Sequence, residues 1–238
     1  MKKNKKSVAI VALGNSCSEY LMSKIRSETF DEVWAINSIA AAIFHDKVFM
    51  MDPPSRFLDG EFAGKQTNAM KERLLKKLDI PIFSCTTDKR CPDVIDYPLQ
   101  EVLEKTKYAY LNNTVAYAIA YAVAYEATEL HLYGVDFSHK NVHFAESGRA
   151  CCEFWLAIAI SNKIKVKIAS TSSLLDTNVP DEEKLYGYHR LDDPIVSTTT
   201  QGSMLITRKS KLEPPEPLDL QPNLIGRKDI KGLSYEEK

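Results

Sequence analysis

Short apolar runs alternate with helix-forming stretches along most of the chain, and this alternation limits the fold more than any other feature. Residues 7–14 (SVAIVALG) are rich in β-branched residues and end in a glycine, which is typical of a strand buried on both faces of a parallel sheet. Residues 67–79 (TNAMKERLLKKLD) instead repeat their apolar side chains with the period of an amphipathic helix. Strands that alternate with helices form right-handed crossovers, so the pattern predicts a doubly wound, mostly parallel sheet.

The sequence therefore predicts an α/β fold with one Rossmann-like domain at residues 1–176 and a sheet of about six strands. The expected strands are residues 7–14, 30–37, 45–52, 80–86, 129–137 and 163–170. The expected helices are residues 18–27, 67–79, 112–127 and 147–161, with a short helix within 94–105.

The C-terminal extension is expected to be irregular. Residues 177–210 are interpreted as a flap or strand pair that packs on the domain. Residues 211–238 are polar and hold four of the eleven prolines, which favours a tail over a packed core.

Composition excludes several classes of protein. The net charge of −1 gives no support to a duplex-binding surface, and no apolar run is long enough to span a membrane. The apolar part of the N-terminus is shorter than a secretory core, so we expect a cytoplasmic protein. None of the five cysteines forms a C-x-x-C pair, which disfavours zinc, and adjacent Cys151 and Cys152 are interpreted as buried apolar side chains.

Polar residues follow the ends of several predicted strands, where open α/β sheets bind their ligands. Gly14, Asn15 and Ser16 form a turn before a helix. Two interpretations are open: the free N–H groups at the start of that helix donate hydrogen bonds to a phosphate, or the turn is only a structural cap. The turn lacks the G-x-G-x-x-G and G-x-x-x-x-G-K-[ST] patterns, which disfavours an ordinary dehydrogenase or P-loop NTPase.

Two further strand ends carry candidate ligand contacts. Asn37, followed by Ser38, is placed to read a base or ribose through its amide, or to tie down a loop. Asp52 ends the third predicted strand. Asn113 and Thr114 open the alanine-rich helix, where they act as an N-cap or as phosphate contacts.

The same helix carries a stripe of tyrosines with a four-residue spacing. Tyr117, Tyr121 and Tyr125 share one face, and core or interface packing is the favoured interpretation. The stripe and the apolar helix at 147–161 leave a homo-oligomer open.

The loop after the fifth strand carries the most informative side chains. Asp136 ends that strand, and His139 and His143 follow within seven residues. A neutral imidazole is a good general base for a hydroxyl nucleophile near pH 7. Two histidines and an aspartate are also a set of metal ligands, although their loop spacing differs from that of helical metal motifs.

Together these motifs resemble bacterial sialyltransferases that use CMP-sialic acid, of the Campylobacter lipooligosaccharide type. They also resemble the wider superfamily of motility accessory factors and 6-hydroxymethylpterin diphosphokinase, over about residues 7–176. VALGNSCS is similar to the family's glycine–asparagine turn, and WAINS is similar to its strand that ends in a nucleotide-contacting asparagine. The resemblance places Thr114 where a serine of the family contacts the donor.

The resemblance selects His143 over His139 as the general base, because His143 lies ten residues before Glu153-Phe154, as the family's base histidine does. The family's long lid is absent, since only SHKN separates Phe137 from Val142. Tyr188 and Arg190, in the segment YGYHR, are hypothesised to take over the lid's contacts with the departing phosphate.

The resemblance thus implies a metal-independent, inverting glycosyltransferase that needs no cofactor besides its nucleotide-sugar co-substrate. The acceptor would be a glycan or a modified nucleic acid, and small proteins of this kind also resemble phage-encoded enzymes linked to DNA modification. The chemical alternative is a pyrophosphokinase with Mg²⁺ held by Asp52 and Asp136. A nucleotide-binding module without catalysis is the third hypothesis.

Overall fold

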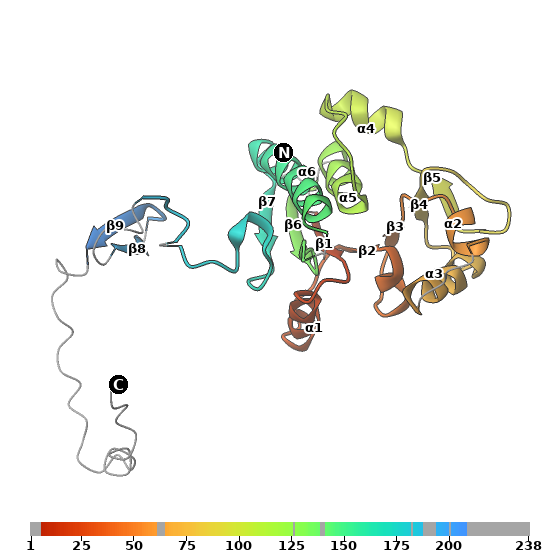
Figure 1. Ribbon diagram of the computed structural model, residues 1–238, viewed down its shortest axis with the longest axis horizontal. Coiled ribbons are helices and arrows are strands. Elements are labelled where there is room, and N and C mark those ends of the chain that lie inside the picture. Colours follow the sequence, from red (N-terminus) through yellow and green to blue (C-terminus); the bar gives the residue numbers. More distant parts are fainter. Residues whose placement is uncertain are drawn as a thin grey trace, which may run out of the picture. The chain divides into compact units, whose positions relative to one another are not determined.

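The computed structural model describes residues 6–60, 65–125, 127–138, 141–181, 183–187, 194–199 and 201–208. The chain divides into two compact units, residues 1–180 and 181–238, which are described separately. The first unit is an α/β fold built on a seven-stranded sheet (Figure 1). Its strands are β1 Ser7–Val11, β2 Glu32–Ile36, β3 Lys47–Phe49, β4 Ile82–Ser84, β5 Val94–Asp96, β6 Glu129–Tyr133 and β7 Lys165–Ile168.

In the described part of this unit, six α-helices connect these strands. They are α1 Cys17–Ile25, α2 Ser55–Leu58, α3 Lys65–Leu75, α4 Leu99–Thr106, α5 Thr114–Ala124 and α6 Val142–Ser161. Two short 3₁₀ helices, η1 Asn37–Ala41 and η2 Leu174–Asp176, follow β2 and β7.

The sheet order is β5-β4-β3-β2-β1-β6-β7, and every neighbouring pair is parallel. The chain builds outward from β1 to β5 on one side and then returns to place β6 on the other side of β1. This confirms the doubly wound, Rossmann-like prediction. The point where the order reverses lies between β1 and β6, which is where such sheets commonly bind ligands.

Both faces of the sheet are covered by helices, as Figure 1 shows with α5 and α6 above it and α1 and α3 below. Along β1, Val8 and Ile10 belong to the core cluster under α5 and α6, whereas Ala9 and Val11 belong to the cluster that contains α1 and α3 residues. This alternation explains why residues 8–11 of the strand are all apolar.

The tyrosine stripe on α5 packs against the core, as the sequence predicts. Tyr121 lies against Trp34 and Phe49 with ring centroids 5.4 and 5.5 Å away. Tyr97 donates a hydrogen bond from its hydroxyl to the carbonyl of Tyr117 at 2.9 Å. Cys151 and Cys152 are also buried and free, and burial raises the pKa of the Cys152 thiol well above its usual range.

The sheet has one strand more than the sequence predicts. Residues 94–105 were expected to contain a short helix, and they hold the edge strand β5 before α4 begins at Leu99. β5 has only three residues, of which one is buried, so its sequence is too short to show the alternation of apolar and polar residues that predicts a strand.

The second unit contains an antiparallel strand pair, β8 Pro194–Thr198 and β9 Met204–Arg208. Residues 211–238, expected to form a tail, lie outside the described residues. Among the described helices, none is both long and apolar enough to cross a membrane.

Candidate nucleotide site

The predicted site residues that the structure describes lie at the carboxyl edge of the sheet, in three groups. The first joins the β1–α1 turn to the segment after β6, and the second surrounds a pocket at the ends of β2 and β3. The third lies where α5 and α6 begin.

The first group is closed by hydrogen bonds between Ser16 and Asp136. Ser16 donates to the Asp136 carboxylate from its backbone N–H at 2.6 Å and from its hydroxyl at 2.5 Å. The same hydroxyl accepts a bond from the Gly134 N–H at 2.8 Å. Because Ser16 is only 1% exposed, these bonds are sheltered from water and tie β1 firmly to β6. We call Gly14, Ser16, Gly134 and Asp136 the turn clamp.

The glycines of the turn clamp are required by close packing. A Cβ atom on Gly14 would lie 2.6 Å from the Asp136 carboxylate and from the Gly134 carbonyl. Gly134 has a φ of +68°, and a Cβ there would lie 2.1 Å from the carbonyl oxygen of Ala12. The glycines thus bring the two backbones together rather than leaving room for a ligand.

The Asp136 carboxylate also lies beside the amino end of α1, because it accepts the backbone N–H of Ser16, the residue before the helix begins at Cys17. Helix N-termini attract anions because their free N–H groups and dipole are positive there. Ser16 stands at the N-cap position, yet its side chain makes no capping bond and serves the carboxylate instead. In this chain an internal anion therefore takes the place predicted for a phosphate, while the neighbouring Asn15 stays exposed.

The second group surrounds a pocket of about 270 Å³. We call it the β2–β3 pocket; its lining residues are Leu13, Asn37, Ser38, Asp52, Arg56, Phe57 and Thr67. Asn37 and Ser38 follow β2, and Asp52 follows β3, so parallel strand ends bring these three predicted residues together. Leu13, which is 42% exposed, extends the wall toward the β1–α1 turn.

Asn37 is the least satisfied residue of this pocket. Its side-chain oxygen Oδ1 is buried and has no hydrogen-bond partner among the described residues. Its backbone φ is +55°, a left-handed conformation that asparagine tolerates better than most residues. Buried acceptors without a partner are rare in folded proteins, and this one points to a donor that the described residues do not supply.

Asp52 and Arg56, which also line the pocket, form an ion pair. Arg56 Nη1 donates to Asp52 Oδ1 across one turn, and the Asp52 carbonyl accepts a bond from the Ser84 hydroxyl at 2.9 Å. The Arg56 side chain is 67% exposed, so most of its donors face solvent. The pocket thus combines an apolar wall, an unpaired acceptor and an ion pair.

The third group is organised by Asn113. Its side chain caps α5 by accepting a bond from the Ala116 N–H at 3.0 Å, and it donates to the Gly148 carbonyl of α6 at 3.1 Å. Asn113 therefore joins the start of α5 to the second turn of α6. Thr114, the first residue of α5, is half-buried, and its side chain has no partner within the described part of the chain.

His143 lies in the first turn of α6 with an exposed side chain. One turn later, Ser147 accepts bonds from the Asn112 amide at its carbonyl (3.0 Å) and hydroxyl (2.9 Å). The imidazole thus stands on a helix start that is fixed to the start of α5. Its ring forms no hydrogen bond with any residue that the structure describes.

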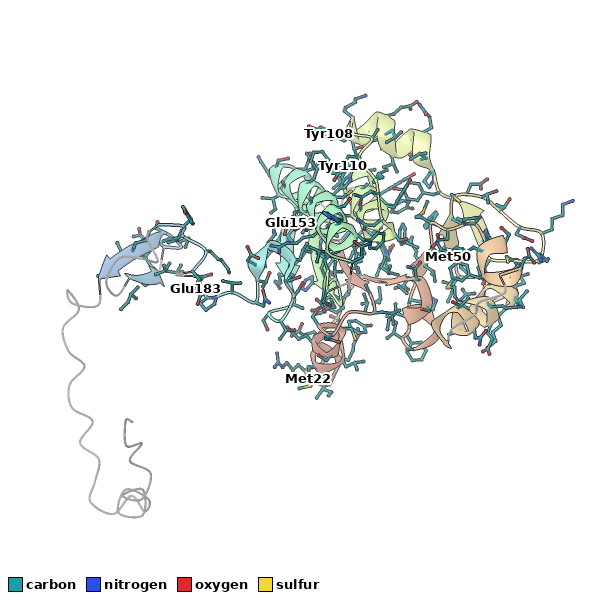
Figure 2. All side chains as sticks on the ribbon, viewed as in Figure 1. Met22, Met50, Tyr108, Tyr110, Glu153 and Glu183 are labelled. Atoms are coloured by element: carbon teal, nitrogen blue, oxygen red, sulfur yellow. The ribbon has the colours of Figure 1, made fainter. Side chains whose placement is uncertain are left out.

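The Glu153-Phe154 pair, which the resemblance uses to select His143, has structural contacts. Glu153 accepts bonds from Arg149 at 2.8 Å and from the Leu175 N–H at 2.9 Å. Phe154 packs edge-on against Tyr108 and Tyr110, which lie on the segment between α4 and α5 beside α6 (Figure 2).

Sequence reasoning did not find every residue of the pocket. Arg56, Leu13, Phe57 and Thr67 line it without having been predicted. The one available signal was the position of Arg56, four residues after Asp52. His139, Tyr188 and Arg190 lie outside the described residues, so their predicted roles stay predictions. The described residues contain no group of three or more His, Cys, Asp or Glu side chains that could hold a metal ion.

Comparisons with known proteins reveal a structural likeness. No protein-family model matches the chain. No curated protein matches it either. The chain is similar to the sialyltransferase CstII from Campylobacter jejuni in complex with a substrate analogue, CMP-3FNeuAc, with 18% identity, a TM-score of 0.44, and coverage of 71% of this chain and 82% of that one.

Two further sialyltransferase structures give similar values. One is a mutant of alpha-2,3/8-sialyltransferase CstII, with 18% identity, a TM-score of 0.46, and coverage of 71% of this chain and 84% of that one. The other is CST-II in complex with trisaccharide acceptor and CMP, with 18% identity, a TM-score of 0.45, and coverage of 71% and 83%. The chain therefore shares structural similarity with a sialyltransferase over 71% of its length, and no sequence family is identified for it.

Proposed function

We propose that this chain is a glycosyltransferase-like enzyme that binds a nucleotide sugar at the carboxyl edge of its sheet and transfers the sugar to an acceptor hydroxyl. The observation that carries the proposal is the buried, unpartnered Oδ1 of Asn37 in the β2–β3 pocket. In doubly wound folds, a side chain at the end of the second strand commonly accepts a hydrogen bond from a ribose hydroxyl. A ribose hydroxyl would supply the donor that Asn37 lacks.

The remaining pocket residues suit the same ligand. Ser38 and Asp52 offer further acceptors for hydroxyl groups, and Leu13 offers an apolar surface for a base or sugar face. Asn15, exposed beside Leu13, and Thr114 at the start of α5 are proposed to contact the sugar phosphate part. Gly14, Ser16 and Asn113 are proposed to position these side chains, because their own polar groups already bind protein partners.

His143 is the proposed general base. Its exposed imidazole would take the proton of the acceptor hydroxyl while that oxygen bonds to the anomeric carbon. The bond from that carbon to the nucleotide phosphate would break at the same time, and the nucleotide would leave with the electron pair. Attack opposite the leaving group inverts the configuration. Asp136 is proposed to act through the turn it holds, not by contact with the reacting atoms.

The test of the base is the variant His143→Ala. General-base catalysis contributes about 10²–10⁴-fold, so transfer should fall by roughly that factor while the Kd of the nucleotide changes little. Glu146→Ala, an exposed residue on the same helix, is the matched control and should keep wild-type activity. Full activity of His143→Ala would refute the assignment of the base.

Donor and acceptor are identified by screening. Thermal unfolding would be measured with CMP, UDP, GDP, ATP and their sugar conjugates, with and without Mg²⁺. A ligand at a hundredfold excess over its Kd stabilises the protein by about 2.7 kcal/mol, which is readily observed. Glycans and modified nucleosides would then be offered as acceptors. A donor that binds and yields no product with any acceptor would favour the non-catalytic module.

The pyrophosphokinase alternative requires Mg²⁺ bound by Asp52 and Asp136. Asp136 uses both carboxylate oxygens to hold Ser16, and Asp52 is paired with Arg56. These contacts disfavour a shared magnesium site. Full turnover in excess EDTA would support the transferase, whereas loss of turnover that Mg²⁺ restores would support the pyrophosphokinase.

A further inference from the structure

We propose that Arg56 binds the phosphate of a nucleotide in the β2–β3 pocket, and that it replaces the α1 N-terminus in that role. The inference rests on the proposed nucleotide binding and adds the residue that recognises the anionic group. Two independent observations support it: the Ser16–Asp136 hydrogen bonds beside α1, and the position of Arg56 in the pocket.

The first contact removes the usual phosphate site. Ser16, the N-cap residue of α1, gives both its N–H and its hydroxyl to Asp136, and the N–H groups of Cys17 and Ser18 bond to backbone carbonyls of the preceding turn. A phosphate placed there would lose the two Ser16 donors and would stand next to a like charge. Like charges within a few ångströms repel strongly where water is excluded, and Ser16 is almost fully buried. A nucleotide phosphate must therefore find its charged donor elsewhere, in addition to the side-chain contacts proposed for Asn15 and Thr114.

The second observation is a cation, Arg56, in the β2–β3 pocket at the carboxyl edge of the sheet. Among the seven described residues that line the β2–β3 pocket, Arg56 alone is positively charged. It shares the lining with Asn37, whose free acceptor calls for a hydroxyl or amine donor. A ligand that offers both a hydroxyl and an anion, as a ribose phosphate does, satisfies both residues at once.

The geometry of Arg56 suits a phosphate. A guanidinium has five N–H donors arranged in a planar fork, and one of its nitrogens, Nη1, is engaged with Asp52. Its other donors bond to no described residue, and the side chain is 67% exposed. Asp52 fixes one branch of the fork, which lowers the entropy lost when a phosphate binds the other branch. Bidentate binding of phosphate by arginine is among the stronger charge-assisted contacts.

The size of the pocket agrees with a ligand that is only partly enclosed. Its volume of about 270 Å³ is smaller than that of sites that bury a whole drug-sized molecule. It therefore accommodates a ribose phosphate better than an entire nucleotide. The base would extend along the exposed side chain of Leu13.

The experiment compares nucleotides with nucleosides, so that the phosphate is isolated. Calorimetry would give the Kd values of CMP, UMP, GMP and AMP, each beside its own nucleoside, for the wild type and for Arg56→Gln. In the wild type, the monophosphate should bind about tenfold or more tightly than its nucleoside. In Arg56→Gln that ratio should fall to about twofold, with the nucleoside Kd unchanged. Arg56→Lys should keep an intermediate ratio, because it retains the charge without the fork.

Arg26→Gln is the matched control. Arg26 is exposed and lines a different pocket, so its loss should leave the ratio at the wild-type value. If Arg56→Gln keeps the wild-type ratio, the inference is overturned while the proposed function stands. If none of the four monophosphates binds the wild-type protein, the proposed function fails, and this inference fails with it.

Discussion

The turn clamp and the β2–β3 pocket lie at the same edge of one sheet, yet their polar groups are used in opposite ways. In the turn clamp, Asp136 has a donor on each carboxylate oxygen, and both donors come from Ser16. In the pocket, Asn37 keeps a buried oxygen with no partner among the described residues. Polar residues at strand ends therefore belong to two kinds: those that hold the fold together and those that remain available to a ligand.

This difference leads to opposite expectations for substitutions. A change in the turn clamp should reduce stability because it breaks contacts that the folded protein makes with itself. A change in the pocket should reduce affinity and leave stability nearly unaltered. Four substitutions test the distinction, beginning with the largest expected effect.

Gly134→Ala should have the largest effect. The new Cβ would lie 2.1 Å from the Ala12 carbonyl oxygen, on a residue with a φ of +68°. Left-handed strain and overpacking together should lower the free energy of unfolding by about 3–5 kcal/mol. Urea unfolding followed by circular dichroism measures this. A loss below about 1 kcal/mol would show that the backbones at this point are not in tight contact.

Asp136→Ala should have the next largest effect. Removing the carboxylate breaks two short bonds to a buried serine, which should lower the free energy of unfolding by about 3 kcal/mol. Asp136→Asn keeps an acceptor and should lose about half as much. Combining Asp136→Ala with Ser16→Ala in a double-mutant cycle tests the pairing directly. A coupling free energy near zero would contradict the turn clamp.

Asn37→Gly should separate affinity from stability. Glycine accepts the left-handed φ of +55°, and the lost amide oxygen has no partner in the described structure, so the free energy of unfolding should change by less than about 1 kcal/mol. The Kd of the nucleotide should rise roughly tenfold, since a ribose hydroxyl loses its acceptor. Unchanged affinity, or a large loss of stability, would place Asn37 with the structural residues instead.

Asn15→Ala should have the smallest effect. Asn15 is exposed and adjoins the turn clamp without being part of it. The free energy of unfolding should stay within about 0.5 kcal/mol of wild type, and the Kd should rise about threefold through the loss of one solvent-exposed hydrogen bond. A loss of stability as large as that of Asp136→Ala would extend the turn clamp to this residue.

The sequence predicted much of the fold because the parallel strands are apolar on both faces and are separated by clear helices. It did not predict β5, since a three-residue edge strand is defined by its pairing with β4 and not by its own pattern. The expectation that ligands bind at the carboxyl ends of parallel strands also located Asn37, Ser38 and Asp52, which do share a pocket.

The difference between Asp136 and Asn37 was not predictable from sequence. Both are polar residues that follow a buried strand. Whether such a side chain is satisfied depends on partners far along the chain, such as Ser16, 120 residues before Asp136. Arg56 was missed for a similar reason, because an arginine four residues after an aspartate is usually an ordinary surface ion pair.

The most direct test of the division between the turn clamp and the β2–β3 pocket is an NMR titration of the ¹⁵N-labelled protein with the nucleotide that binds best in the thermal screen. We predict the largest amide shifts at Asn37, Ser38 and Phe57, with the Ser16 amide nearly unmoved and still protected from exchange by Asp136. If instead Ser16 shows the largest shift and Asn37 none, the nucleotide binds at the amino end of α1, and the account of an open pocket beside a closed turn is wrong.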